Sequence, residues 1–183
     1  QQDHQHDIGQ LSSDAANLHA GQTPHAGDMP QAGGDSHRRL FLEFCCGHNS
    51  KLCNPIHIGD PNCDAVRLTK DIDMTTPEGL RFAIQQVQVC QGHITLWASI
   101  PCTGGSPWQY VNEKQYYKNQ DIQKLKKLKG HISIFRKLFW SFQDLAREVL
   151  RKGGIVCMEW PTPCKYWRDP QVIDFLRSYG FIK

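Results

Sequence analysis

The first 37 residues contain no lysine, no arginine and no aromatic residue. Their large aliphatic residues are limited to Ile8, Leu11 and Leu18, whereas five aspartates and five of the nine histidines lie among them. Such a segment cannot bury enough apolar surface to offset the chain entropy that folding removes. The composition therefore predicts a disordered polar tail over 1–37 and one folded domain over 38–183.

The sequence also lacks an apolar run of about 20 residues, which a membrane span requires, and no signal peptide opens it. Its eight cysteines include the adjacent Cys45 and Cys46 but no paired C-x-x-C spacing, so neither a disulfide framework nor a metal site is predicted. We expect a protein of a reducing intracellular compartment, cytoplasm or nucleus, with no membrane partner. The chain begins with Gln rather than Met, so we expect a fragment of a longer polypeptide.

Four short apolar runs from residue 40 onward predict buried strands. They cover 40–44, 65–69, 93–100 and 155–160, and turn residues bound each run. Between 47 and 65 there is room for only a short or broken helix, and between 101 and 130 we expect a long polar loop. Because the sequence ends where a further strand would begin, we expect the fold to be truncated at its C-terminus.

Helical patterns separate these strands. Thr76 and Pro77 are typical of a helix start, as are Asp169 and Pro170. Within 131–152 the apolar residues recur at helical spacing: Phe135, Leu138, Phe139, Phe142, Leu145, Ala146 and Val149. Strands that alternate with helices predict an α/β fold, Rossmann-like, with a mostly parallel sheet and helices on both faces.

Residues suited to chemistry follow the predicted strands. Cys102 comes after the strand 93–100, and Glu159 closes the strand 155–160. The carboxyl ends of parallel strands meet at one edge of a sheet, where α/β proteins place ligands. Cys102 is therefore either a reactive thiol or a small buried residue in a strand-to-loop corner. Glu159 is either a site residue or a capping or ion-paired residue.

The order of these segments resembles the class I S-adenosylmethionine-dependent methyltransferases. In that family an acidic residue and a Gly-rich turn follow the first strand, and Glu43 and Gly47 match the acidic residue and the central glycine. Glycine lets the backbone approach the cofactor because it has no Cβ. An acidic residue after the second strand holds the ribose. The resemblance therefore implies an S-adenosylmethionine site formed by Glu43, Cys45, Gly47, Asn49 and either Asp71 or Asp73.

The segment after the strand 93–100 resembles two subfamilies. Ser99 and Pro101 fit the first and third positions of the signature of amine-methylating enzymes, whose polar residue and carbonyls accept the amine protons. Pro101, Cys102 and Glu159 match the cytosine-C5 enzymes, in which a thiolate attacks the ring and a glutamate holds the flipped base. The resemblance implies Cys102, Glu159 and Ser99 as catalytic residues, and a cytosine C5 or an exocyclic amine as the target.

Three strings are also similar to methyltransferase-like segments of retroelement-type polyproteins. They are Leu-Phe-Leu-Glu-Phe-Cys-Cys-Gly at 40–47, Ile-Pro-Cys-Thr-Gly-Gly-Ser at 100–106 and Met-Glu-Trp-Pro at 158–161. No established activity comes with this likeness. The alternative function is therefore a non-catalytic module of a polyprotein, which binds nucleic acid or serves in assembly.

Positive charge gathers between the two motifs of the predicted target pocket. The segment 113–137 has seven Lys and one Arg against two acidic residues, and Trp108, Tyr110, Tyr116 and Tyr117 interleave with it or precede it. Basic and aromatic side chains together are typical of surfaces that bind nucleic acid, although a solvated lysine-rich helix start has the same composition. We expect nucleic acid to contact Lys114, Lys118, Lys124, Lys126, Lys127 and Lys129.

Overall fold

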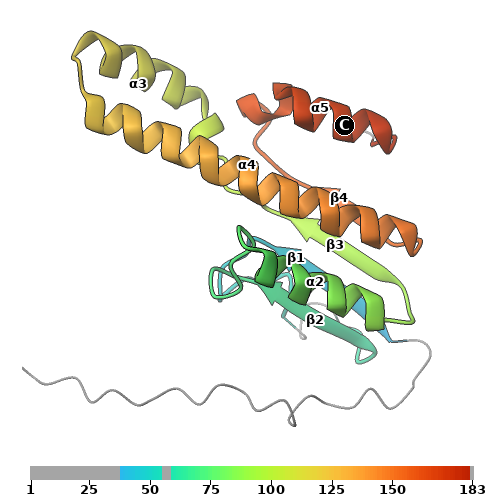
Figure 1. Cartoon of the computed structure of the whole chain (residues 1–183). Helices are drawn as coiled ribbons and strands as arrows, with labels where there is room; N and C mark the ends of the chain where they lie inside the picture. Colours follow the sequence, from blue (N-terminus) through green and yellow to red (C-terminus); the bar gives the residue numbers. More distant parts are fainter. Residues whose placement is uncertain (1–37, 55–58, 182–183) are drawn as a thin grey trace, which may run out of the picture. The chain divides into compact units, whose positions relative to one another are not determined.

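A computed structural model describes residues 38–54 and 59–181. They form a four-stranded parallel sheet in the order β2-β1-β3-β4 (Figure 1). The strands are β1 (Arg39–Phe44), β2 (Cys63–Leu68), β3 (Ile94–Ala98) and β4 (Ile155–Met158). Each overlaps a predicted strand, and the expected Rossmann-like α/β arrangement is confirmed. The predicted polar tail over 1–37 lies outside the described residues.

Helices follow β2, β3 and β4 along the chain. The main helices are α2 (Pro77–Val89), α3 (Pro107–Lys118), α4 (Ile122–Arg151) and α5 (Pro170–Ser178), with the short 3-10 turns η1 (Thr103–Gly105) and η2 (Lys165–Arg168). The predicted helix starts are confirmed: the side chain of Thr76 accepts a hydrogen bond from Gly79 N, and Asp169 Oδ1 accepts one from Gln171 N. Such caps satisfy backbone donors that have no partner within the helix.

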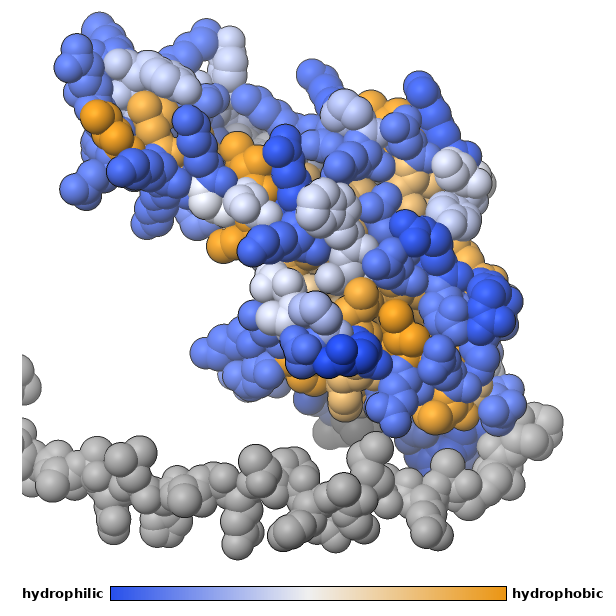
Figure 2. Space-filling model, viewed as in Figure 1, coloured by the Kyte–Doolittle hydropathy of each residue, from blue (hydrophilic) through white to orange (hydrophobic). Residues whose placement is uncertain are grey.

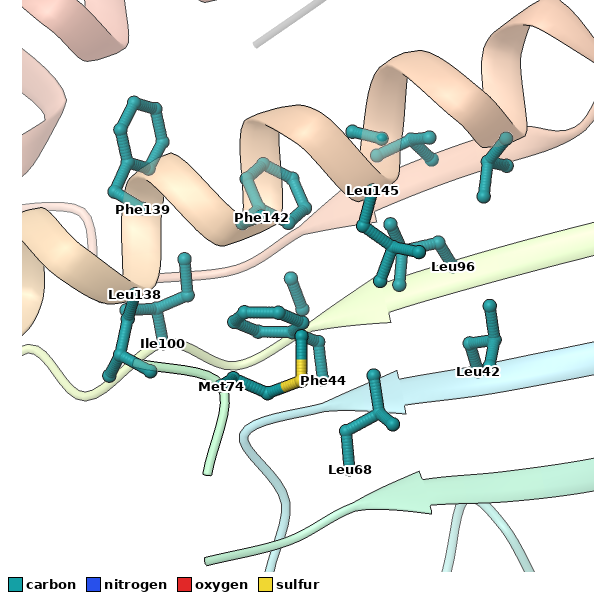
Figure 3. Packing of buried hydrophobic residues seen from close by; sticks show 14 of the residues in the cluster. Leu42, Phe44, Leu68, Met74, Leu96, Ile100, Leu138, Phe139, Phe142 and Leu145 are labelled. Carbon is teal, nitrogen blue, oxygen red and sulfur yellow. The ribbon is translucent and has the colours of Figure 1, made fainter. Parts of the chain in front are cut away.

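The core lies between the sheet and α2 and α4. Leu42 and Phe44 of β1 and Leu96 of β3 share one face of the sheet, and all three are buried. Figure 3 shows Leu138 and Leu145 of α4 pointing toward these strands. The seven apolar residues that the sequence placed on this helix, from Phe135 to Val149, are all buried. Their helical spacing therefore marked the core face correctly.

The other face of the sheet meets the segment between β1 and β2. Glu43 and Arg67 are paired in register on this face. Arg67 Nη2 donates to the carbonyl oxygens of Ser50 and Cys53, at 3.1 and 2.9 Å, and thereby ties the segment to β2. Its described residues form turns. The helices α2 and α4 thus cover one face of the sheet, whereas the described residues over the other face form turns, so the expected helices on both faces are not seen in this part of the chain.

The region after β3 differs from the prediction. The expected polar loop between 101 and 130 is helical, since α3 and the first turns of α4 occupy most of it. The α3 helix has no buried residue, so it has no apolar stripe that periodicity could detect. Pro107 at its first position and many Lys, Gln and Glu residues nevertheless favour a helix.

We call residues 107–130 the arm. In Figure 1, α3 and the start of α4 extend beyond the end of the sheet. None of the described helices combines the length and the apolar character that a membrane span requires.

Lys152 joins the end of α4 to the end of α2. Its ammonium group donates to the carbonyl oxygens of Val87, Gln88 and Cys90, at 3.0, 2.7 and 2.7 Å. These carbonyls lie at the C-terminus of α2, where a positive charge is favourable. We expect Lys152→Met to lower the free energy of unfolding by about 1 kcal/mol, since the side chain is exposed and its charge is partly screened.

Urea denaturation measures this effect. Lys129→Met is the matched control, because Lys129 is exposed and makes no hydrogen bond or ion pair within the described residues. Equal stability of the two variants would show that the three hydrogen bonds of Lys152 contribute nothing.

Candidate functional site

A pocket of about 480 Å³ opens at the C-terminal ends of β3 and β4. It is lined by Ser99, Ile100, Pro101, Cys102, Glu159, Trp160 and Pro161, and we call it the strand-end pocket. The three residues that the sequence proposed as catalytic, Ser99, Cys102 and Glu159, all line it. Ser99 Oγ donates a 2.7 Å hydrogen bond to Glu159 Oε1, although these residues are 60 positions apart.

Backbone hydrogen bonds beyond the strands place these side chains. Ser99 N donates to Phe44 O, and Glu159 N donates to Ala98 O, each at 3.0 Å. The parallel pairing thus continues for one residue past the ends of β3 and β4. Ser99 and Glu159 are consequently held by the sheet ladder rather than by a loose loop.

Trp160 forms the buried wall of the pocket. Its indole Nε1 donates a 2.6 Å hydrogen bond to the carbonyl oxygen of Ile100, and the side chain is 9% exposed. Its ring packs edge-to-face against Phe135 of α4, with ring centroids 5.8 Å apart. Sequence analysis assigned Trp160 no role of its own. An apolar residue directly after Glu159 was the available signal.

Cys102 is half-buried and directly precedes η1 as its N-cap residue. The next turn is packed under Tyr166 of η2, because a Cβ on Gly105 would lie 2.8 Å from that ring. Burial raises the pKa of the Tyr166 hydroxyl, and the nearby Cys164 and Cys102 thiols add to the rise. Sequence analysis assigned no role to the Gly104-Gly105 pair. Its role is steric, since only glycine leaves room for the tyrosine.

The turn after β1, residues 45–50, carries the positions of the implied cofactor site. Cys45 has φ +62°, a left-handed conformation that glycine adopts more easily than cysteine. The side chain of Cys45 packs against the core. Gly47 and Asn49 are exposed, and a Cβ on Gly47 would meet no atom within 4 Å. The outer side of the turn is therefore open at Gly47.

Glu43 lies beneath this turn instead of lining its open side. The side chain is 3% exposed, and its Oε1 accepts a hydrogen bond from Ser50 Oγ. Burial raises the pKa of the Cys46 thiol to about 11 and that of Cys53 to about 12, and the Glu43 carboxylate contributes to both rises. The Glu43 carboxylate thus holds Ser50 of the turn from its buried side.

The two candidate ribose ligands have different surroundings. Asp71 is exposed, and its Oδ2 lies 3.2 Å from His48 Nε2, so it borders the turn after β1. Asp73 Oδ1 accepts hydrogen bonds from Thr75 N at 2.9 Å and Thr75 Oγ1 at 2.7 Å. These bonds lower the pKa of Asp73 and hold its carboxylate just before the start of α2. Asp71 is the carboxylate that faces the open turn.

The lysines predicted to contact nucleic acid all lie on the arm. They are Lys114, Lys118, Lys124, Lys126, Lys127 and Lys129, and every one is exposed. Lys124 Nζ forms an ion pair with Asp121 Oδ2 at 2.8 Å. No other lysine of this set forms an ion pair within the described residues. In Figure 2 the arm is mostly hydrophilic, with small pale and orange areas. The lysines are therefore on a helical surface rather than in a loop.

Metal ligands are not gathered in the described part of the chain, where no three His, Cys, Asp or Glu side chains could hold an ion together. Comparison of the chain with protein-family models, with curated proteins and with solved structures found no match. Arguments about function therefore start from the geometry of the strand-end pocket, the turn after β1 and the arm.

The Gly105–Tyr166 contact allows a matched test. Gly105→Ala should lower the free energy of unfolding by about 1–3 kcal/mol, because its Cβ would overlap the Tyr166 ring. Gly47→Ala adds the same methyl group in open space and should change stability by less than about 0.5 kcal/mol. Urea denaturation of both variants measures the difference. Equal losses would mean that the tyrosine does not rest on the η1 turn.

Proposed function

We propose that this chain is an S-adenosylmethionine-dependent methyltransferase-like protein that acts on a base of a nucleic acid. The observation that carries the proposal is the convergence of Ser99, Cys102 and Glu159 in one pocket at the carboxyl edge of a parallel sheet. Open α/β sheets bind ligands at this edge. The eight cysteines are free thiols, which fits the reducing intracellular compartment that we propose for the protein.

The pocket residues suit two reactions. For a cytosine C5 target, the Cys102 thiolate would add to ring carbon C6 and make C5 nucleophilic. After methyl transfer to C5, loss of the C5 proton to water would let the bond between Cys102 and C6 break, which restores the ring and the thiolate. Glu159 would hold the amine edge of the base, and Ser99 would orient Glu159 through the 2.7 Å hydrogen bond. For an exocyclic amine target, Ser99 and the neighbouring carbonyls would accept the amine protons, and no thiolate would be needed.

The cofactor would supply an electrophilic methyl group. The turn after β1 fits it on its open side, where Gly47 lets the backbone approach a ligand and Asp71 offers an exposed carboxylate for the ribose hydroxyls. Asn49 lies on the same exposed turn. Glu43 and Cys45 would support the turn without touching the cofactor. The side chain of Glu43 is buried, and that of Cys45 packs against the core.

A second candidate is a non-catalytic module of a polyprotein that binds nucleic acid through the arm. Two observations favour it. The carboxylate at the family's acidic position is buried, and a cysteine holds the left-handed position in the turn after β1. The lysines of the arm would serve this function without any cofactor.

Titration calorimetry with S-adenosylmethionine tests the proposal. The wild-type chain should bind the cofactor, and Gly47→Val should abolish binding while circular dichroism stays unchanged, because its side chain would fill the approach to the turn. Asp71→Asn should weaken binding at least about tenfold through loss of a charged acceptor. Asp73→Asn is the matched control and should bind normally, since asparagine can still accept the bonds from Thr75.

Two results would contradict this assignment. Unchanged binding in Gly47→Val would show that the cofactor does not lie against the turn. No binding to the wild-type chain would leave the non-catalytic module as the function.

A further inference from the structure

We propose that the outer face of the arm binds single-stranded nucleic acid, with a base stacked on Tyr117 and phosphates held by the lysines around it. The inference rests on the proposed function, since it names the form in which the substrate reaches the strand-end pocket. It also stands if the chain is a non-catalytic module.

The α3 helix has one side that faces the protein and one that does not. Its half-buried residues Gln109, Asn112 and Tyr116 recur at helical spacing, and α3 packs against α4. Tyr110, Lys114 and Tyr117 are exposed and follow one another at i, i+4 and i+7. They therefore form a separate stripe in which a cation lies between two aromatic rings.

The aromatic side chains of this helix do not contribute to the core. Trp108 is 75% exposed and Tyr117 is 58% exposed, and α3 has no buried residue. Large aromatic rings in water are costly, and several on one short helix mark a binding surface. Flat rings that carry no other partner are suited to stacking with bases, each of which has a π-face.

The charge around these rings favours a polyanion. Lys114 Nζ lies 4.1 Å and Lys165 Nζ 4.4 Å from the centroid of the Tyr110 ring, so two ammonium groups gather on one tyrosine. Lys118, Lys126, Lys127 and Lys129 have no acidic partner within the described residues. Lysines that are not neutralised by the protein are available to phosphates.

The composition of the arm favours a single strand over a duplex. Residues 107–130 contain no arginine, which is the residue that most often reads base edges in the major groove. Stacking on Tyr117 requires a base that is not paired in a helix. Trp108 lies nine positions before Tyr117, about two and a half turns, and so projects from the opposite side of α3, whereas Tyr110 and Lys114 lie on the same side as Tyr117. Neither stacking nor phosphate contact reads the sugar, so RNA and DNA strands should both bind.

The arm begins at the strand-end pocket. Cys102 lines that pocket and is followed directly by η1 and then by α3. Lys165 reaches back from η2 to the Tyr110 ring near the start of α3. A strand bound along α3 would consequently pass beside the pocket with its bases already unpaired. The energy that a duplex-acting enzyme uses to extrude a base would not be needed.

Fluorescence anisotropy of the full chain with labelled 12-nucleotide oligothymidylate, oligouridylate and a duplex of equal length tests this inference. The single strands should bind more tightly than the duplex at equal salt. Tyr117→Leu should weaken single-strand binding by about 5- to 150-fold, the range to which the stacking energy of one base converts. Its slope of log affinity against log salt should stay unchanged, because no charge is removed.

Two matched controls separate stacking from charge. Trp140→Leu removes an exposed tryptophan of α4 outside the arm and should leave binding unchanged. The combined change of Lys118, Lys126, Lys127 and Lys129 to Gln should flatten the salt slope, whereas Arg147→Gln, outside the arm, should not. Equal or tighter binding of the duplex, or a Tyr117→Leu variant that binds like the wild type, would overturn the inference.

Other occupants of the arm give distinct results. Polyglutamate of equal charge that competes as well as oligothymidylate would indicate an acidic protein partner and overturn the inference. Self-association that Trp108→Leu abolishes in sedimentation would indicate a second copy of the chain and overturn it too. Binding of oligonucleotides by Gly47→Val should equal that of the wild type. A failure of cofactor binding therefore leaves this test intact, and a failure of strand binding leaves the cofactor test intact.

Discussion

The rest of the fold depends on the packing of three buried phenylalanines of α4, which form its aromatic stripe: Phe135, Phe139 and Phe142. Phe142 meets Phe44 of β1 and Phe175 of α5, with ring centroids 5.8 and 5.6 Å apart, and Phe135 stacks on Tyr166 of η2 at 3.5 Å. One helix thereby joins the centre of the sheet, the last helix and the turn after β4. Loss of a buried phenylalanine from such a cluster costs about 3–5 kcal/mol, a large part of the stability of a domain.

The same stripe fixes the strand-end pocket. Phe135 packs against Trp160, which in turn donates to the carbonyl of Ile100, so the wall of the pocket is tied to the core. Tyr166 rests on Gly105 and thereby sets the direction in which the chain leaves Cys102 for α3. Phe135 packs against both Trp160 and Tyr166, so the same packing sets the wall of the pocket and the direction of the arm. Chemistry at strand ends requires this kind of support from packed neighbours.

Some of this was predictable from the sequence, and the reasons are physical. The seven apolar residues from Phe135 to Val149 have one period and one buried face, so their pattern predicted the core helix. The motifs at strand ends predicted that Cys102 and Glu159 would lie at one edge, because parallel strands share an edge, and both line the strand-end pocket. The helix α3 was missed since it buries nothing. The burial of Glu43 was missed because it depends on how the segment after β1 folds back over the sheet, which no local pattern specifies.

The most specific part of the proposal is the cytosine reaction, in which Cys102 would add to a base held by Glu159 in the strand-end pocket. The most direct measurement is covalent capture of a single-stranded oligonucleotide that carries a mechanism-based cytosine analogue such as 5-fluorocytosine, with S-adenosylmethionine present, read by mass spectrometry. The account predicts an adduct on Cys102 that is lost in Cys102→Ser and kept in Cys157→Ser, which removes a half-buried thiol of β4 outside the lining of the pocket. No adduct with the wild-type chain, or an adduct that persists in Cys102→Ser, would contradict it.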